Sequence, residues 1–207
     1  MSVLTTVPTQ FFNGAAAVPS EPIWRLSVAQ YHEMIRNGIL TEDDPVELLE
    51  GWLVTKMPKN PQRRLTTKLT QTAFERVIPA GWYVDTQEPI TTDSSEPEPD
   101  VVVVRGEPRQ YSDRHPGPQD LGALVEVSGA SLYRDRGTKK RVFAENRIPV
   151  YWIINLVSKQ VEVYTNPTGP GPAPDYRECR VYGITDQVPL TLDGREVGSI
   201  PVSELLP

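Results

Sequence analysis

Two carboxylates, Asp100 and Glu126, occupy sequence positions where a charge is unfavourable. Glu126 interrupts the apolar run Leu121–Val127, and an ionised carboxylate inside a buried strand is costly unless it is paired or binds a metal. Asp100 directly precedes four valines, Val101–Val104, a pattern typical of a strand buried on both faces. Each also has an ordinary alternative, because Glu126 could reach solvent at a strand end and Asp100 could simply end a turn.

The order of these residues predicts that the two carboxylates meet. If the two strands pair antiparallel, Asp100 at the start of one lies beside Glu126 near the end of the other. Such a pair is a minimal site for Mg²⁺ or Mn²⁺, which prefer carboxylates and relieve the repulsion between them. We therefore expect the two groups within ~5–8 Å of each other, close enough to share one metal.

The surrounding sequence predicts a mixed α/β layout in which helices cover a central sheet. A capping box formed by Ser27 and Gln30 predicts a helix over about 28–37. Apolar residues at every fourth position predict an amphipathic helix over 62–78, and a third helix is expected over 135–146. The expected strands are 46–54 (bent at Gly51), 82–85, 88–92, 101–104, 121–127, 150–155, 159–164, 176–182 and 188–192.

Length and composition limit the class of protein. The 207 residues favour one domain over 21–207, behind a flexible arm at 1–20. Within that domain we expect a core at about 26–164 and C-terminal strands over 176–205. The 21 prolines disfavour an all-helical bundle. The single cysteine, Cys179, excludes an internal disulfide and a cysteine-rich zinc site.

The lack of a histidine cluster, a membrane span and a secretory signal limits the kind of metal site and the cellular compartment that we expect. The two histidines, His32 and His115, are far apart in the sequence, which disfavours a histidine cluster and leaves carboxylates as the main ligands of any metal. No run approaches the ~18 apolar residues of a membrane span. Residues 1–20 contain no Lys or Arg, unlike the start of a secretory signal. We therefore expect a soluble cytoplasmic protein without a membrane partner.

The charge distribution bears on nucleic-acid binding. A net charge of −6 argues against indiscriminate binding to nucleic acid. Basic residues nevertheless gather in two segments: 56–68 contains no acidic residue, and 134–147 carries six positive charges against two negative. Solvated surface is the ordinary explanation for such blocks.

Several segments, taken in order, resemble a known family. Pro99–Asp100, Glu126–Ser128, Asp135–Lys139 and Tyr151–Ile154 resemble motifs of the Uma2 family, a restriction-endonuclease-like branch of the PD-(D/E)XK nuclease superfamily. Val46–Gly51 resembles the early E-L-x-x-G strand of that family. The resemblance implies a restriction-endonuclease-like fold, with a mixed central sheet flanked by helices. It also implies hydrolysis of DNA phosphodiester bonds that depends on Mg²⁺ or Mn²⁺, without a small-molecule cofactor.

The lysine of the superfamily motif is displaced in this chain. Its usual position, two residues after the glutamate, is Ser128, and Uma2 proteins supply the lysine from the following helix, here Lys139 or its neighbour Lys140. Lys139 and Phe143 share a helix face, so Lys139 should lean toward the sheet; a surface lysine is the ordinary alternative. As an edge residue it should be replaceable by alanine with little effect on folding. Asp135 is expected to be the helix N-cap rather than a catalyst.

The resemblance implies that Asp100 and Glu126 hold the metal, with Glu47 either a further ligand or a strand-surface residue. Family members often carry a histidine just after the proline-rich turn near 58–62; Gln62, Arg63 and Arg64 stand there in this chain, so no histidine role carries over. The residues expected to hold the nucleic-acid backbone are Arg63, Arg64, Arg134, Arg136, Lys140 and Arg141.

Other functional classes stay open. One is a binding or regulatory protein that keeps the fold but does not cleave, and another is a structural dimeric domain without a nucleic-acid partner. The net negative charge favours these classes. If the protein is a nuclease, we expect a homodimer, because enzymes that cut both strands of DNA commonly pair two active sites and two-fold dimers are the commonest oligomers.

Overall fold

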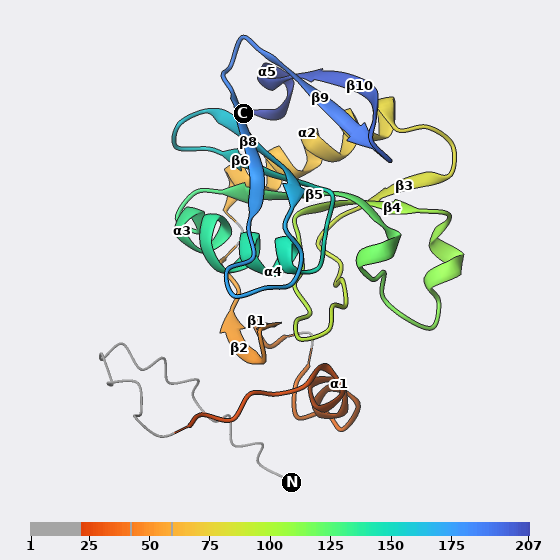
Figure 1. The fold of residues 1–207 in the computed structure, drawn as a ribbon, viewed down its shortest axis with the longest axis vertical. Coiled ribbons are helices and arrows are strands. Elements are labelled where there is room, and N and C mark those ends of the chain that lie inside the picture. Colours follow the sequence, from red (N-terminus) through yellow and green to blue (C-terminus); the bar gives the residue numbers. More distant parts are fainter. Residues whose placement is uncertain (1–21, 42, 59) are drawn as a thin grey trace, which may run out of the picture.

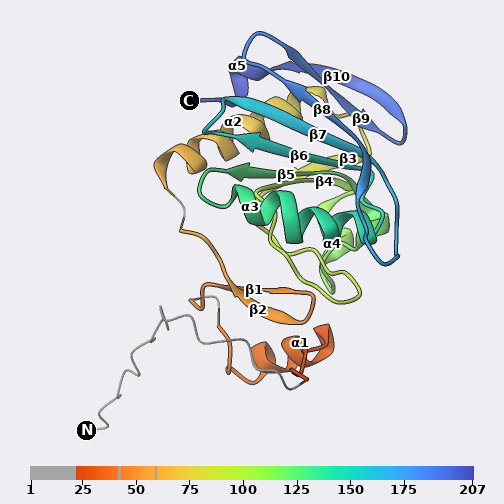
Figure 2. The ribbon, with the colours of Figure 1, turned by 60° about the vertical axis from the view of Figure 1, so that its left-hand side comes forward.

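The computed structural model describes residues 22–41, 43–58 and 60–207, and its centre is a six-stranded mixed sheet. The arm expected over 1–20 lies outside the described residues. In Figures 1 and 2 the sheet forms a middle layer, with helices on both of its faces. This is the helix-flanked mixed α/β sheet that the sequence predicts.

The strand order of the sheet is β3-β4-β5-β6-β7-β8. Neighbouring strands run antiparallel except β5 and β6, which are parallel because a helical connection crosses over between them. Every residue of β5 and β6 is buried, as expected of central strands covered on both faces. The strands are β3 (Trp82–Asp85), β4 (Val101–Arg105), β5 (Leu121–Ser128), β6 (Val150–Asn155), β7 (Gln160–Pro167) and β8 (Tyr176–Tyr182).

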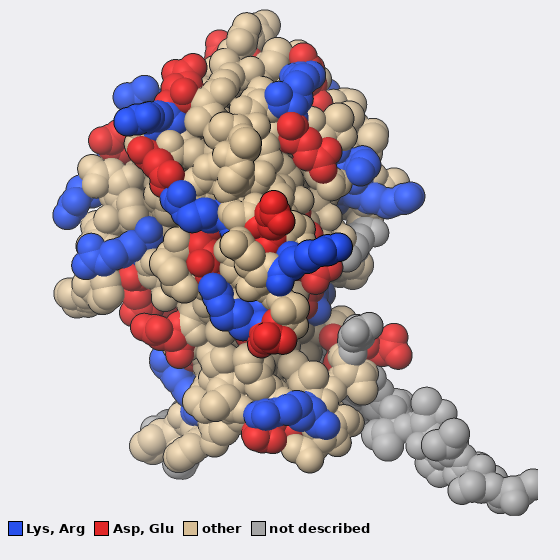
Figure 3. Space-filling view, turned by 90° about the vertical axis from the view of Figure 1, so that its right-hand side faces the viewer, with Lys and Arg blue, Asp and Glu red and all other residues tan. Residues whose placement is uncertain are grey.

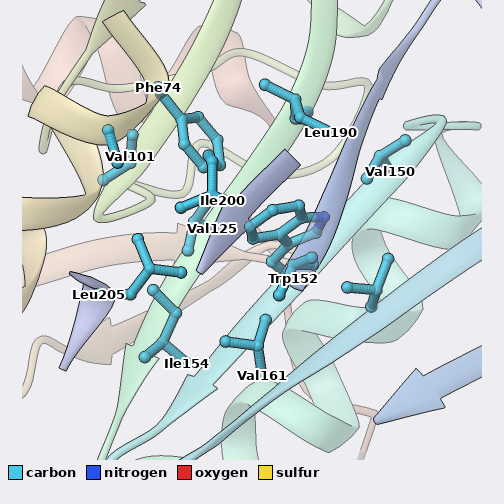
Figure 4. Close-up of a cluster of buried hydrophobic side chains, with 14 of the residues drawn as sticks. Phe74, Val101, Val125, Val150, Trp152, Ile154, Val161, Leu190, Ile200 and Leu205 are labelled. Atoms are coloured by element: carbon cyan, nitrogen blue, oxygen red, sulfur yellow. The ribbon is translucent and has the colours of Figure 1, made fainter. Parts of the chain in front are cut away.

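One face of the sheet is covered by a long helix and a C-terminal hairpin (Figure 2). These elements are α2 (Pro61–Val77), β9 (Gln187–Leu192), β10 (Arg195–Pro201) and α5 (Val202–Leu205). Figure 4 shows the core on this face, where Phe74 of α2 meets Trp152 of β6 edge to face, with ring centroids 5.1 Å apart. A turn at Asp193–Gly194 joins β9 to β10, and both of its residues have the positive φ that such two-residue turns require.

The opposite face carries the crossover between β5 and β6. It consists of α3 (Leu132–Arg134), a π-helical turn (Asp135–Lys139) and α4 (Lys140–Glu145), with Val142, Phe143 and Ala144 buried against the sheet. The helix predicted over 135–146 therefore starts earlier than expected and is not α-helical throughout.

The N-terminal elements lie beyond this second layer (Figure 2). They are α1 (Val28–Arg36), which has the predicted capping box, and the hairpin β1 (Val46–Leu49) and β2 (Trp52–Thr55). Gly51 turns the hairpin at φ +80°, and an added Cβ would lie 2.6 Å from Arg25 Cβ, so only glycine fits there. A bridge between Leu48 and Glu96 ties the hairpin to the segment that precedes β4.

Two predictions about these elements are wrong. Residues 88–92 form no strand, because the backbone N–H groups of Ile90, Thr91 and Thr92 donate to three separate residues rather than to one partner strand. On α2, Leu65 is 47% exposed, and the buried positions are Thr66, Thr67, Thr70, Ala73 and Phe74. None of the helices in the described ranges is long and apolar enough to cross a membrane.

Candidate active site

Asp100 and Glu126 lie side by side at one end of the sheet. The strands β4 and β5 pair antiparallel with Val101 opposite Val125, so the next position along places Asp100 opposite Glu126. Both side chains are buried. One nitrogen, Nη2 of Arg63, lies 2.9 Å from Asp100 Oδ2 and 3.7 Å from Glu126 Oε2, so the two oxygens are separated by no more than the sum of these distances. The structure therefore brings together the two carboxylates that the sequence predicts to meet.

Strand alternation explains the environment of Glu126. Leu124 packs in the core beneath α4 and Val125 in the core beneath α2, so Glu126 faces the α4 side. At this position the covering layer is the π-helical turn, which presents Asp135 and Lys139 as its buried residues. The polar end of the strand is thus covered by polar side chains instead of apolar ones.

Lys139 is buried against Glu126 and is not a surface lysine. Its Nζ lies 2.7 Å from Glu126 Oε1 and 3.3 Å from Glu47 Oε2, and the residue is 2% exposed. Burial tends to lower the pKa of Lys139, but the two carboxylates raise it above its ordinary value. Burial also raises the pKa of Glu126 well above its usual range, and Lys139 opposes that shift. Lys140 instead pairs with Asp175 at 2.8 Å.

Glu47 is a third buried carboxylate of the cluster, so the alternative of a strand-surface residue is wrong. Its Oε2 accepts the backbone N–H of Glu98 at 3.2 Å, and its Oε1 lies 3.9 Å from Arg134 Nη1. The bridge between Leu48 and Glu96 brings this hairpin against the segment before β4. Only a contact between segments distant in sequence reveals this burial.

Asp135 is not a helix N-cap, which corrects the sequence-based expectation. It has helical backbone angles, and its Oδ2 accepts hydrogen bonds of 2.6 Å from both Ser128 Oγ and Ser131 Oγ. Its carbonyl accepts the Tyr151 hydroxyl at 3.1 Å. These bonds fix the π-helical turn that carries Lys139, and such turns are frequent at functional sites. Ser128, at the usual lysine position of the superfamily, therefore helps to hold this turn.

Arg63, expected to bind a nucleic-acid backbone, lies within the carboxylate cluster. Its Nε donates to both carboxylate oxygens of Asp100, at 3.0 and 3.1 Å, and the side chain is only 14% exposed. Burial tends to lower the pKa of Arg63, whereas Asp100 and then Glu126 raise it. Asp100 also accepts the backbone N–H of Val127 at 2.8 Å, so its orientation is fixed from two sides.

Most of the other predicted backbone-binding residues are engaged in ion pairs. The pairs are Arg134 with Glu47, Arg136 with Glu162, Lys140 with Asp175 and Arg141 with Glu50. Figure 3 shows one face of the molecule, on which acidic and basic side chains alternate without a continuous basic surface. The structure therefore does not assemble these four residues into a free basic patch.

Arg64 differs from them because it is exposed beside a groove. The groove, with a volume of about 640 Å³, is lined by Arg64 and Lys68 of α2 and has no acidic residue in its lining. It shares Gln87 with the smaller cavity of about 30 Å³ that is lined by Asp100, Glu47, Arg63 and Lys139, among others. Sequence reasoning missed Lys68, although it lies one helical turn after Arg64.

The structure also brings together the two histidines. The rings of His32 and His115 lie 6.5 Å apart, although they are distant in sequence. Glu96 Oε2 lies 2.7 Å from His32 Nε2 and accepts the Thr91 hydroxyl at 2.6 Å. These residues line a cavity of about 830 Å³ that shares no lining residue with the carboxylate cavity. Distance in sequence therefore does not keep these two rings apart.

The carboxylate cluster fits a divalent metal by its chemistry. Glu47, Asp100 and Glu126 offer the hard oxygen donors that Mg²⁺ and Mn²⁺ prefer. Arg63 and Lys139 already supply positive charge to these carboxylates. Within the described residues, no group of three or more His, Cys, Asp or Glu side chains is arranged to hold a metal ion. The donor types are therefore suitable, and cationic side chains hold them in this conformation.

Comparisons with known proteins agree with this fold. Residues 28–202 match the model of the Uma2 family, described as "Putative restriction endonuclease". A similar solved structure is a "putative nuclease belonging to DUF820" from Anabaena variabilis ATCC 29413, with 14% identity, a TM-score of 0.62, and coverage of 87% of this chain and 97% of that one. No curated protein is significantly similar to the chain. Because the family match spans most of the sequence, the chain belongs to the Uma2 family and has its nuclease-like fold.

Proposed function

We propose that this protein is a metal-dependent nuclease that hydrolyses phosphodiester bonds in DNA. The observation that carries the proposal is the convergence of Asp100, Glu126, Glu47 and Lys139 at one end of the sheet in a nuclease-family fold. Three carboxylates and a lysine from four separate segments have no need to meet for folding alone. Buried ionic clusters are a weak source of stability, which favours a functional reason for this one.

The roles follow from the contacts. Asp100, Glu126 and Glu47 would hold Mg²⁺ or Mn²⁺, which supplies Lewis-acid stabilisation of the phosphate and activation of water when bound. Lys139 stays protonated beside its carboxylates and would stabilise negative charge that develops on the scissile phosphate. Asp135 positions Lys139 by fixing the π-helical turn through Ser128. These groups are held before substrate arrives, which reduces reorganisation during the reaction.

A homodimer remains part of the proposal and rests on the frequency of two-fold pairing among oligomers. Light scattering at micromolar protein concentration tests it, and a monomer mass there would remove it. Cleavage does not depend on this result, because each chain carries its own complete cluster.

The decisive experiment is cleavage of supercoiled plasmid and of single-stranded DNA with Mg²⁺ or Mn²⁺. We expect the wild-type protein to cut and Asp100→Asn and Glu126→Gln to lose cutting while staying folded. Glu178→Gln is the matched control, because Glu178 is an exposed carboxylate on β8 outside the cluster. Absence of metal-dependent cutting by the wild-type protein on every substrate would contradict the proposal.

One observation favours a second candidate, a nucleic-acid-binding or regulatory protein that keeps the fold without cleaving. Arg63 and Lys139 hold the carboxylates in ion pairs, and a site with this charge balance is stable without metal. This candidate predicts retention of DNA at low salt without cutting, and equal retention by the wild-type protein and Asp100→Asn.

A further inference from the structure

We infer that the Arg63 side chain occupies the metal position of the carboxylate cluster, so that a divalent cation binds there only after Arg63 withdraws. This inference rests on the proposed function and deepens it, because it names what controls metal access to that site.

The geometry supports occupancy rather than mere proximity. The guanidinium contacts Asp100 through two nitrogens, Nε at 3.0 Å and Nη2 at 2.9 Å, and Nη2 also lies 3.7 Å from Glu126. Nη2 therefore contacts both of the carboxylates that would share a metal. A cation bound to both would need oxygen contacts of about 2.0–2.6 Å, which conflicts with a nitrogen in that place.

The small space around the cluster also indicates that Arg63 and a metal ion compete for the same place. The cavity lined by Asp100, Arg63 and Lys139 has a volume of about 30 Å³. A water needs about 10–15 Å³ of such space, so the cavity has room for only about two waters, whereas Mg²⁺ usually keeps several. The space beside the guanidinium is therefore small for a hydrated cation in this conformation.

The charge of the cluster favours replacement of the Arg63 guanidinium by a divalent metal ion over binding of both at once. Without Arg63, the ionised forms of Glu47, Asp100 and Glu126, as they would stand around a bound cation, together with Lys139 leave a formal charge of −2. The nearby Arg134 and Asp135 contribute one charge of each sign. A divalent cation would balance this charge, whereas adding one while Arg63 remains would leave an excess of positive charge.

Arg63 can withdraw without unfolding the helix that carries it. It lies in the first turn of α2, where the helix is capped by the Asn60 side chain and not by Arg63. The guanidinium is held at the outer edge of the cluster, with 14% of the side chain exposed. Rotation of the flexible stem toward solvent would free both carboxylates and leave α2 in place.

Metal binding to the whole protein tests the inference independently of cleavage. Mn²⁺ affinity would be measured by calorimetry and electron paramagnetic resonance for the wild-type protein, Arg63→Ala and Arg134→Ala. If Arg63 occupies the site in more than about nine-tenths of molecules, Arg63→Ala should bind Mn²⁺ at least ~10-fold more tightly. Arg134→Ala is the matched control, because it removes a positive charge near Glu47 without emptying the space between Asp100 and Glu126.

Each outcome decides the inference. A rise in Mn²⁺ affinity in Arg63→Ala alone, lost again when Asp100→Asn is added, supports occupancy of the site by Arg63. An equal rise in Mn²⁺ affinity in Arg63→Ala and Arg134→Ala would show a general charge effect and overturn the inference. Equal affinity of Arg63→Ala and the wild-type protein, or no Mn²⁺ binding by either, would overturn it too. The plasmid assay judges the nuclease proposal separately.

A second measurement on the wild-type protein covers the case in which Arg63→Ala fails to fold. The Arg63 Nε–H donates to a buried carboxylate and should give a slowly exchanging ¹⁵N resonance without metal. Titration with Mg²⁺ should abolish that protection as Arg63 leaves Asp100. Persistence of the protected resonance throughout the titration would overturn the inference.

Discussion

Lys139 and Glu126 form a buried ion pair with 2.7 Å between Nζ and Oε1. The contact joins the π-helical turn to β5, and Glu47 adds a second carboxylate 3.3 Å from the same ammonium. Loss of Lys139 would remove the ammonium that Glu126 and Glu47 share, whereas loss of the Glu126 charge would still leave Lys139 beside Glu47. The expectation that an edge lysine can be removed with little effect on folding therefore starts from a wrong premise.

Replacing Lys139 with alanine should destabilise the protein strongly. Removing one partner of a buried pair typically costs about 3–5 kcal/mol, because the remaining charge stays buried. Adding Glu126→Gln to Lys139→Ala should restore part of that loss, since it removes the uncompensated carboxylate. Urea unfolding of the single and double variants measures both effects, and cutting should fall by ~10²–10³ in Lys139→Ala molecules that remain folded.

Lys140→Ala is the control for that experiment, because Lys140 pairs with the half-exposed Asp175 on the surface. We expect a change within the ~0–1 kcal/mol typical of surface pairs, and full cutting activity. A dead Lys140→Ala beside an active Lys139→Ala would transfer the catalytic role to Lys140.

The groove beside α2 should carry the nucleic-acid backbone, because Arg64 and Lys68 line it without an acidic neighbour in the lining. The double variant Arg64→Ala/Lys68→Ala should weaken DNA binding and reduce its salt dependence. Each lost phosphate contact to duplex DNA lowers the slope of log K against log salt by about 0.9, so two contacts give a change of about 1.8. Fluorescence anisotropy across a salt series, in chelator to prevent cutting, measures this.

Arg180→Ala is a suitable comparison, because Arg180 is an exposed arginine on β8, outside the groove. It should leave the salt slope unchanged. The groove assignment would be wrong if the two variants lowered the slope equally, since the effect would then reflect overall charge.

The sequence predicts the arrangement of Asp100 and Glu126 because both signals are local. A carboxylate directly before a run of valines marks one strand, a carboxylate inside an apolar run marks the other, and antiparallel pairing then places the two together. The capping box of α1 and the turn at Asp193–Gly194 are equally local, and the structure contains both.

The roles of Glu47 and Arg63 depend instead on how separate segments pack. Burial of Glu47 requires the β1–β2 hairpin to lie against the segment before β4, a contact that no local pattern encodes. The charge run around Arg63 indicates a solvated or backbone-binding face, yet this one arginine turns toward Asp100. Side-chain direction at the start of a helix is set by the surroundings, which composition does not describe.

Glu162 is buried and pairs with Arg136, one of the residues that the sequence predicts to bind DNA. Arg136 donates two hydrogen bonds to Glu162 in a bidentate pair, at 2.9 Å from Nε and 2.5 Å from Nη2. Tyr164 and Asn155 also donate to Glu162. Burial tends to raise the pKa of Glu162, but Arg136 and the other donors lower it below its ordinary value. A carboxylate with a lowered pKa stabilises the fold above its unfolded-state pKa of about 4.3, and this contribution disappears as the pH falls through the folded-state value.

Glu162→Gln should therefore clearly lower the urea midpoint of unfolding at pH 7. The difference in midpoint between the variant and the wild-type protein, the midpoint gap, should become smaller as the solution is acidified below the ordinary pKa of glutamate. The reason is that the wild-type carboxylate becomes protonated and loses its advantage over the amide. Glu178→Gln, an exposed control on β8, should shift the midpoint little at either pH. A gap that stays constant on acidification would show that Glu162 contributes through shape and neutral hydrogen bonds. The ion pair between Glu162 and Arg136 would then contribute no stability, and Arg136 could leave Glu162 to contact DNA without destabilising the fold.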